Sequence, residues 1–343
     1  MPLPMTEYFR PLVQHGPARP DAALPLAGGA LWFTHALRLA RGAAPEVVDA
    51  ATLPDAWTEA LTGPRAPVAG LDMSASRLMG ILNVTPDSFS DGGRFDASEV
   101  AVRHAHAMAE AGAEMIDIGG ESTRPGSDPV DMDEELARVV PVIERIATGA
   151  LPPVSIDTRK TPVARAAVEA GAALVNDVSG FTYDDTLAPY CAEAGLPVCV
   201  MHAQGDPKTM QEAPHYDNVL LDVYDLLAGR VTALEAAGIP RTKIVVDPGI
   251  GFGKTLAHNL ALLQGIALFH GLGCPVLLGA SRKGFIGAIT GERDAAARAP
   301  GSVAAALAGA AQGVQILRIH DVAETNAALK VWQATVKGQN DGT

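Results

Sequence analysis

From residue 78 onward, the sequence repeats one unit, a short apolar run followed by a longer segment with apolar residues at helical spacing. Eight such runs predict strands: Leu78–Val84, Ala113–Ile118, Pro153–Ile156, Ala173–Asn176, Pro197–Met201, Lys243–Val246, Pro275–Leu278 and Val314–Ile319. Helices are expected between them, as over Glu99–Ala111, Asp133–Ala147, Val163–Ala170, Asn218–Ala237 and Thr255–Leu272. This α/β pattern has no topological switch, so it favours a closed (β/α)8 TIM barrel over an open doubly wound sheet.

The first 75 residues break this pattern and are predicted to be an N-terminal extension that ends in a barrel plug, with the barrel itself over 76–340. Apolar runs at Tyr8–Val13 and Ala30–Leu39 and a helix at Leu53–Leu61 suggest a small accessory layer over residues 1–62. Its role stays open, and regulation or partner binding has no support beyond length. A Pro-rich linker follows at 63–67, and Val68–Ser76 is interpreted as a hairpin that plugs the lower end of the barrel.

Charge and cysteine content exclude several kinds of protein. The net charge of −13 argues against nucleic acid or an acidic membrane as partner, because both attract excess Lys and Arg. Cys191, Cys199 and Cys274 form no C-x-x-C pair and are predicted to be buried thiols in a reducing compartment. The first residues do not resemble a signal peptide, and no run approaches the ~20 apolar residues of a membrane helix. We therefore expect a cytoplasmic protein.

The most informative motifs close three successive strands: Asp247–Lys254 (Asp-Pro-Gly-Ile-Gly-Phe-Gly-Lys), Ser281–Lys283, and Arg318–Asp321 (Arg-Ile-His-Asp). In a parallel barrel the loops after the strands face one common mouth, where catalytic residues gather. These motifs therefore predict an active site at the C-terminal ends of the strands. The Gly249–Thr255 stretch does not match a phosphate-binding P-loop, because Pro248 occupies the place of its first Gly. Lys254 is thus interpreted as a loop or helix-start residue.

Polar side chains at three strand ends are expected to converge on the barrel axis. Asp157, Asn176 and Asp247, with Lys283 nearby, can recognise a flat heterocycle, since a carboxylate accepts parallel N–H donors and Lys donates to a carbonyl. The alternative is that such residues bond loop backbone. This structural interpretation is preferred for Asp177 but not for Asp247, because the Pro-Gly turn after Asp247 aims its side chain.

Long polar loops follow the first two strands and have the composition of mobile active-site loops. Asn83 at the first loop can offer an oxygen to a hard cation, although a turn-capping role is the alternative. Arg124 in the second is a candidate anion clamp. Arg318 and His320 alternate along the last strand and so face one side. With Asn83 and Arg124 they are able to hold a diphosphate, directly or through Mg²⁺.

The remaining histidines give weaker signals. His104 and His106, and likewise His258 and His270, fall in predicted outer helices and are expected at the surface. His202 follows a strand, and either role is open. No His, Cys or Glu spacing suggests a zinc site, and no Gly-x-Ser-x-Gly elbow is present.

Five segments together resemble the dihydropteroate synthase family across about residues 76–337: Met79–Gly93, Glu121–Ser127, Asp247–Lys254, Ser281–Lys283 and Arg318–Val322. The resemblance implies a TIM barrel that joins a hydroxymethyl-dihydropterin diphosphate to 4-aminobenzoate in folate biosynthesis. The products are 7,8-dihydropteroate and pyrophosphate. It further implies a requirement for Mg²⁺, a homodimer and inhibition by sulfonamides.

The same resemblance implies a role for each matching residue. Those expected to bind the pterin are Asp157, Asn176, Met201, Asp247, Phe252, Gly279 and Lys283, with Asp157, Asp247 and Lys283 as catalytic groups. The diphosphate is expected at Asn83, Arg124, Arg318 and His320, with Asn83 as metal ligand. The aminobenzoate pocket is expected to comprise Phe89, Thr123, Pro125, Phe252, Lys283 and Gly284. Loss of pyrophosphate would leave a methylene cation conjugated to the pterin, which the arylamine attacks, and closure of the two loops would keep water away.

One residue departs from the family pattern, and two rival functions stay open. Gly284 stands where many members carry a Ser that helps hold the aminobenzoate carboxylate, so weaker affinity for that substrate is expected. A corrinoid methyltransferase that uses methyltetrahydrofolate would keep the Asp and Asn residues that bind the pterin. It would not need the second loop or the Arg-x-His pair. A silent paralogue would bind pterins and use residues 1–62 as an interaction module.

Overall fold

The computed structural model describes residues 6–85, 94–122, 127, 129–149, 151–205 and 210–338. Eight parallel strands form its central sheet: β6 (Arg77–Asn83), β7 (Met115–Gly119), β8 (Val154–Asp157), β9 (Ala172–Asp177), β10 (Val198–Met201), β11 (Ile244–Asp247), β12 (Leu277–Leu278) and β13 (Ile316–Ile319). They are ordered β11-β10-β9-β8-β7-β6-β13-β12. The two ends of this order meet, because Val246 forms a parallel bridge with Val276 and its N–H donates to Pro275 O at 2.9 Å. The closed barrel is therefore confirmed.

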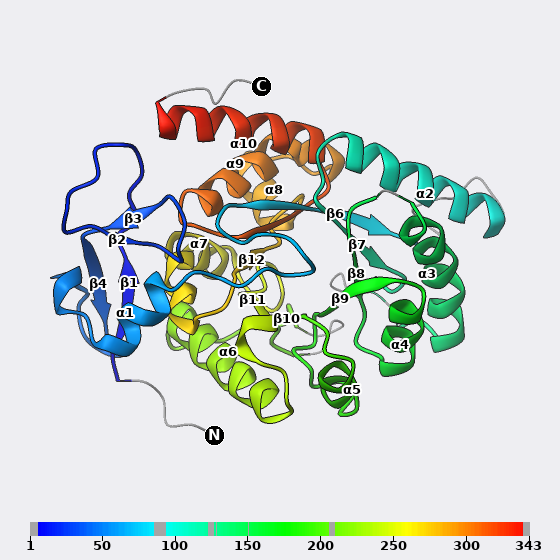
Figure 1. The fold of residues 1–343 in the computed structure, drawn as a ribbon, viewed down its shortest axis with the longest axis horizontal. Helices are drawn as coiled ribbons and strands as arrows, with labels where there is room; N and C mark the ends of the chain where they lie inside the picture. The colour runs from blue at the N-terminus through cyan, green and yellow to red at the C-terminus, as the bar shows by residue number, and fades with distance from the viewer. Residues whose placement is uncertain are drawn as a thin grey trace.

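Helices surround the barrel on the outside (Figure 1). They are α2 (Arg94–Glu110), α3 (Met132–Ala147), α4 (Thr161–Glu169), α5 (Leu187–Glu193), α6 (Val219–Ala236), α7 (Leu256–Gly265), α8 (Gly284–Thr290), α9 (Ala299–Ala310) and α10 (Val322–Lys337), with short 3₁₀ turns η3 (Arg241–Lys243) and η5 (Ala296–Arg298). No helix in the described part of the chain has the length and apolar character needed to span a membrane.

The expected single helix over Thr255–Leu272 is wrong in its second half. The chain forms α7 and then a 3₁₀ segment, η4 (Ile266–Leu272). Gly265 lies at this change, and a Cβ there would approach Leu220 Cδ2 of α6 to 2.6 Å. Close packing of the two helices therefore requires glycine at the point where the helix geometry changes.

The barrel interior is layered, since alternate residues of each strand point inward. The lower layer is apolar and packs against Val68 and Met73 from the segment before β6; its strand residues are Met79, Met115, Leu174, Cys199, Val245, Leu277 and Ile316. Two residues further along, the strands carry Ile81, Asp117, Asn176, Met201, Asp247 and Arg318, and Gly279 follows β12. Charged and polar side chains thus enter the interior at this second layer, which lies nearer the C-terminal mouth.

Residues 6–62 form a separate layer beside the barrel (Figure 1, blue). Its elements are the antiparallel sheet β1 (Tyr8–Pro11), β4 (His35–Leu39) and β5 (Glu46–Asp49), the hairpin β2 (Leu24–Pro25) and β3 (Trp32–Phe33), the turn η1 (Ala50–Thr52) and α1 (Asp55–Thr62). The Tyr8 hydroxyl donates to Asp225 Oδ2 of α6 at 2.8 Å, and the Trp57 ring stacks on Tyr224 with centroids 5.7 Å apart. Polar and aromatic contacts together fix this layer to α6.

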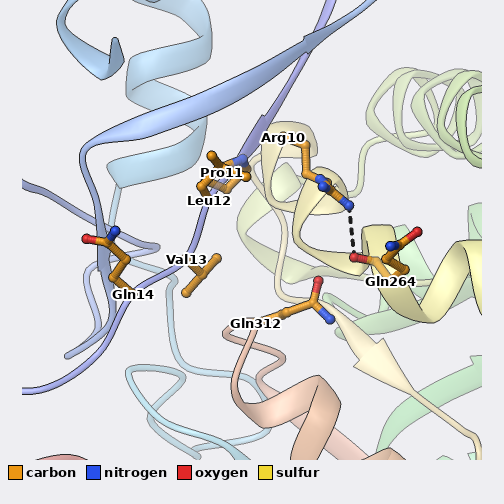
Figure 2. Close-up of a pocket in the computed structure, with 7 residues that line it drawn as sticks. All are labelled: Arg10, Pro11, Leu12, Val13, Gln14, Gln264 and Gln312. Atoms are coloured by element: carbon orange, nitrogen blue, oxygen red, sulfur yellow. Dashed lines mark hydrogen bonds between the residues drawn. The ribbon is translucent and has the colours of Figure 1, made fainter. Parts of the chain in front are cut away.

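A cavity of about 250 Å³ lies at the seam between this layer and the barrel (Figure 2). Its lining comprises Arg10, Pro11, Leu12, Val13, Gln14, Gln264 and Gln312. Arg10 donates from Nη1 to Gln264 O at 3.0 Å, which links β1 to the end of α7. None of the predicted site residues lines this cavity, so it is separate from the barrel mouth.

The predicted surface position of His270 is wrong, because the N-terminal layer covers it. Its side chain is fully buried in η4, and Nε2 lies 2.9 Å from Gln312 O. Arg65 in the linker donates from Nη2 to His270 O at 2.9 Å and is itself buried. By contrast, His104 and His106 are exposed on α2, as expected. The three cysteines are confirmed as free, buried thiols.

Candidate active site

Arg318 on β13 joins two carboxylates of neighbouring strands inside the barrel. Its Nε donates to Asp117 Oδ2 at 2.6 Å, and its Nη2 donates to Asp157 Oδ2 at 2.8 Å. The Asn176 amide also donates to Asp117 Oδ2, at 3.3 Å. The strand registers explain this convergence, because Asp157 pairs with Asn176 across β8 and β9. Four polar side chains therefore meet at one level of the barrel.

Two carboxylate oxygens of this cluster are able to accept further hydrogen bonds. Oδ1 of Asp117 and Oδ1 of Asp157 are buried and have no hydrogen-bond partner in the structure. Burial raises the pKa of Asp157, and the nearby Asp117 adds to this, although Arg318 opposes it. Burial works against the charge of Arg318, but Asp117 and Asp157 more than offset this and its pKa is raised. Unpartnered carboxylate oxygens in a buried cluster are suited to N–H donors of a ligand.

Asp247 is held at the end of β11 by the turn that follows it. Its Oδ1 accepts the Gly249 N–H at 2.7 Å, as the Pro-Gly turn suggested. Burial raises the pKa of Asp247, while the charge of Lys283 lowers it. A Cβ on Gly279 would lie 3.7 Å from Asp247 Oδ2 and 3.9 Å from Lys283 Nζ. Glycine at 279 therefore keeps a space open between the carboxylate and the ammonium.

Lys283 stands opposite Asp247 at the start of α8. Its ammonium donates to Ile250 O and lies 4.5 Å from the centroid of the Phe252 ring. Burial lowers the pKa of Lys283 to about 8, with Asp247 opposing the shift. Met201 pairs with Asp247 across β10 and β11 and is buried. The residues expected at the pterin thus gather around one space, with Phe252 and Met201 as its apolar parts.

Two of the residues expected at the diphosphate, Asn83 and His320, lie nearer the rim. Asn83 ends β6 opposite Gly119, where a Cβ would lie 3.6 Å from Asp157 Cβ and 3.9 Å from Asn83 Oδ1. His320 follows β13, and its Nδ1 lies 3.0 Å from Ser281 Oγ. Arg318, expected with this group, instead contacts the carboxylates deeper in the barrel. Among the described side chains, no group of three or more His, Cys, Asp or Glu is arranged to hold a metal ion.

Four predicted residues, Phe89, Thr123, Arg124 and Pro125, lie outside the described residues. The base of the second loop is described, however. Glu121 is buried and accepts from Val130 N at 3.2 Å, and Lys160 Nζ lies 3.1 Å from its Oε2. Arg159 Nη2 donates to Glu121 Oε1 at 2.9 Å. These contacts join the two ends of the loop to the residues that follow β8.

Other expectations have clear outcomes. Asp177 has the structural role predicted for it, since its carboxylate accepts the N–H groups of Ser179 at 2.7 Å and Phe181 at 2.8 Å. His202, left open, is buried just past the end of β10, beside Lys254. Gly284 begins α8, and a Cβ there would meet nothing within 4 Å. A serine would therefore fit at 284 without a clash.

Sequence reasoning missed Asp117. It lies in the middle of β7 and not at its end, so the search for polar residues at strand ends passed over it. A signal was present: Asp117 shares the inward parity of Met115 and is a charged residue inside an otherwise apolar strand. A buried charge on the inner face of a barrel strand needs a partner, which here is Arg318.

Known proteins resemble this chain in sequence and structure. The model of the family described as "Pterin binding enzyme" matches residues 79–320. The dihydropteroate synthase of Escherichia coli (strain K12) is 47% identical over 271 residues, which cover 79% of this chain and 95% of that protein.

Two solved structures have the same fold. The Xanthomonas albilineans dihydropteroate synthase with 4-aminobenzoic acid has a TM-score of 0.75 and 48% identity, covering 79% of this chain and 98% of that one. The Yersinia pestis dihydropteroate synthase with a sulfonamide drug has a TM-score of 0.73 and 46% identity, covering 77% and 96%.

Proposed function

The chain belongs to the dihydropteroate synthases, transferases of folate biosynthesis within the pterin-binding enzyme family, and from this premise we propose how its own residues divide the reaction. The substrates are 6-hydroxymethyl-7,8-dihydropterin diphosphate and 4-aminobenzoate, and the products are 7,8-dihydropteroate and pyrophosphate. The bond between the methylene carbon and the diphosphate oxygen breaks. A bond from the arylamine nitrogen to that carbon forms, and the amine loses one proton.

The observation that carries the proposal is the pair of facing polar groups inside the barrel. Asp117, Asp157 and Asn176 offer acceptors on one side, while Asp247 and Lys283 stand on the other. Together they match the amino-amide edge of a pterin, with N–H donors to carboxylates and a carbonyl to Lys283. The positive charge that develops on the methylene as pyrophosphate leaves is delocalised over the pterin ring, so buried carboxylates that hold this ring are expected to stabilise the transition state.

The leaving group is expected at the rim, toward Asn83, His320 and the loop that contains Arg124. Asn83 fits a magnesium ligand, because its amide oxygen is a hard donor and Gly119 leaves the space beside it open. One protein oxygen is sufficient where substrate phosphates and water complete the shell. When bound, Mg²⁺ neutralises charge on the departing diphosphate. His320, which is positioned by its contact with Ser281, is expected to orient the diphosphate.

A direct test follows pyrophosphate release from the pterin diphosphate, with and without 4-aminobenzoate. We expect release coupled one to one with dihydropteroate, loss of the reaction in EDTA and recovery with Mg²⁺. A sulfonamide should compete with 4-aminobenzoate. Tight pterin binding without product would support the silent paralogue instead. Unchanged turnover in EDTA would remove the metal from the proposal. The corrinoid methyltransferase is disfavoured, because the relatives are named as synthases.

We also propose a cytoplasmic homodimer. Three unpaired buried thiols suit a reducing compartment, which cell fractionation tests. Apolar side chains are exposed on the outer helices, among them Leu260 of α7 (43%) and Ile289 of α8 (56%), and burying such groups favours association. Light scattering of the purified chain is expected to give twice the monomer mass, and a monomer at micromolar concentration would contradict the dimer.

A further inference from the structure

The loop 248–253 is wound unusually tightly beside the site. Gly249, Gly251 and Gly253 all have positive φ, between +61° and +85°. A Cβ on Gly249 would lie 1.9 Å from His202 O, and one on Gly253 would lie 2.6 Å from Gln204 O. Both contacts are with backbone, so the loop cannot move aside at either point. The alternation of glycines turns some of its carbonyls inward and others outward.

The side chain of Lys254 fills the inside of this turn. Its ammonium donates to Gly249 O at 2.8 Å and to Phe252 O at 2.9 Å, and His202 Nδ1 lies 2.9 Å away. Lys254 is 4% exposed and His202 is 3% exposed. An ammonium only donates, so His202 faces it with an unprotonated Nδ1. All three donor positions of the ammonium are therefore used inside the protein.

We propose that Lys254 is a positioning residue for the pterin: its ammonium shapes the loop that fixes Asp247 and Phe252, and His202 holds that ammonium in place. This role rests on the proposed function. Lys254 itself is buried under the loop and has its bonds satisfied within the protein, so it acts through its neighbours.

The loop carries the effect to the site because two of its other backbone groups bond site residues. Gly249 N–H holds Asp247 Oδ1 at 2.7 Å, while Ile250 O accepts from Lys283. Phe252, whose carbonyl Lys254 holds, places its ring beside the Lys283 ammonium. One loop thus lies between two lysines, Lys254 on the inside and Lys283 on the pterin side. A change at Lys254 shifts Asp247, Phe252 and Lys283 together.

The charge of Lys254 gives this role a signature. Burial lowers the pKa of Lys254 to about 7, with Asp247 opposing the shift and Lys283 adding to it. Its other titratable neighbours are His202, whose pKa burial lowers to about 3, and His258. Below pH 7 Lys254 is therefore an ammonium with three donors, whereas above pH 7 it is an amine with two. The hydrogen bonds from Lys254 to the loop carbonyls therefore weaken as pH rises.

The test compares the chain with its Lys254→Met variant in fluorescence titrations with 6-hydroxymethylpterin at pH 6 and pH 9. We expect Lys254→Met to weaken binding about 10-fold or more at pH 6, because two carbonyls and a ring nitrogen lose a charged donor. The ratio of variant to wild-type Kd should fall toward about 3-fold at pH 9, where the wild type has lost its ammonium. Taking the ratio cancels the titration of groups that do not interact with Lys254. The exposed Lys330→Met on α10 is the matched control and should bind as wild type.

A ratio that does not change with pH would mean that Lys254 only fills space, and wild-type affinity in Lys254→Met would likewise overturn the proposal. No pterin binding by the wild type would instead overturn the proposed function, and this role with it. His202 provides a second pair of variants if Lys254→Met does not fold. His202→Asn keeps an acceptor at the same branch of the side chain and should bind within about 3-fold of wild type, whereas His202→Leu should lose about 5-fold or more. Equal affinities of these two variants would contradict the role of the ring nitrogen.

Discussion

Replacing Asp247 with asparagine is expected to lower kcat/KM for the pterin diphosphate by about 10²–10³-fold. The carboxylate Oδ1 is fixed by Gly249 N–H at 2.7 Å, so Oδ2 is the atom that faces the space beside Gly279. Hydrogen bonds to a charged group contribute about 1.5–3 kcal/mol each. Asparagine loses the charge and offers an NH₂ donor toward the donors of the ligand. The stated factor corresponds to a loss of about 3–4 kcal/mol, the lower part of the range for two such bonds, since about 1.4 kcal/mol is tenfold.

The same substitution should not destabilise the fold, which separates binding from folding. Burial raises the pKa of Asp247, so the folded protein binds this proton more tightly than the unfolded chain. The group therefore adds stability at low pH, and that stability is lost as pH rises through the folded pKa. At neutral pH, asparagine removes a buried charge, and we expect a Tm equal to or above that of the wild type.

Steady-state kinetics with the pterin diphosphate varied, together with thermal unfolding, check both expectations. Asp185→Asn is a suitable control, because Asp185 is exposed on the segment before α5. Wild-type turnover in Asp247→Asn would contradict the proposal that the Asp247 carboxylate binds the pterin. A fall in Tm with a parallel fall in activity would indicate a structural role only.

The barrel and most of its mouth were predictable, because both follow from short-range patterns. Buried parallel strands read as continuous apolar runs, and a polar residue that ends such a run must lie at the common mouth. Asp157 and Asn176 were placed at equivalent positions by this reasoning, and they are register partners in the structure. Asp247 was singled out by the Pro-Gly that follows it, and the Gly249 N–H does aim its carboxylate.

What the sequence did not reveal depends on contacts between distant segments. His270 looked like a surface residue of an amphipathic helix, but Leu26 of the N-terminal layer lies close by. A Cβ on Gly313 would lie 2.7 Å from Leu26 Cδ2 and 3.1 Å from His270 Nε2. No residue close to His270 in the sequence indicates that the N-terminal layer packs over it. Likewise, the meeting of Arg318 with Asp117 depends on how the closed barrel brings β13 near β7, with β6 between them. Pairings across a barrel need the strand order and tilt, which local patterns do not give.

The second large effect is expected for Arg318→Met. Methionine fills similar space but leaves Asp117 and Asp157 without their cation, and both are buried. Removing one partner of a buried ion pair typically costs about 3–5 kcal/mol, because the remaining charge is uncompensated. Dihydropteroate formation should become undetectable, since the acceptors for the pterin lose their geometry.

The stability loss should depend on pH with a defined sign. Burial and the nearby Asp117 raise the pKa of Asp157, and without Arg318 to oppose them this pKa rises further. Acids whose folded pKa is raised are most stable when protonated, so the variant should be closest to wild type at pH 5 and weakest at pH 8. Urea unfolding at the two pH values measures this, and equal losses at both would contradict the paired arrangement.

Adding Asp117→Asn to Arg318→Met separates the structural part of this cluster from its chemistry. Asparagine removes one of the two facing charges, so part of the lost stability should return, and most of it at pH 8. Activity should not return, because one carboxylate oxygen of Asp117 is replaced by an NH₂ donor and the guanidinium of Arg318 is gone from the pterin side. Recovery of turnover together with stability would mean that the cluster only supports the fold. Recovery of stability without turnover would mean that Asp117 and Arg318 act on the substrate and not only on the stability of the fold.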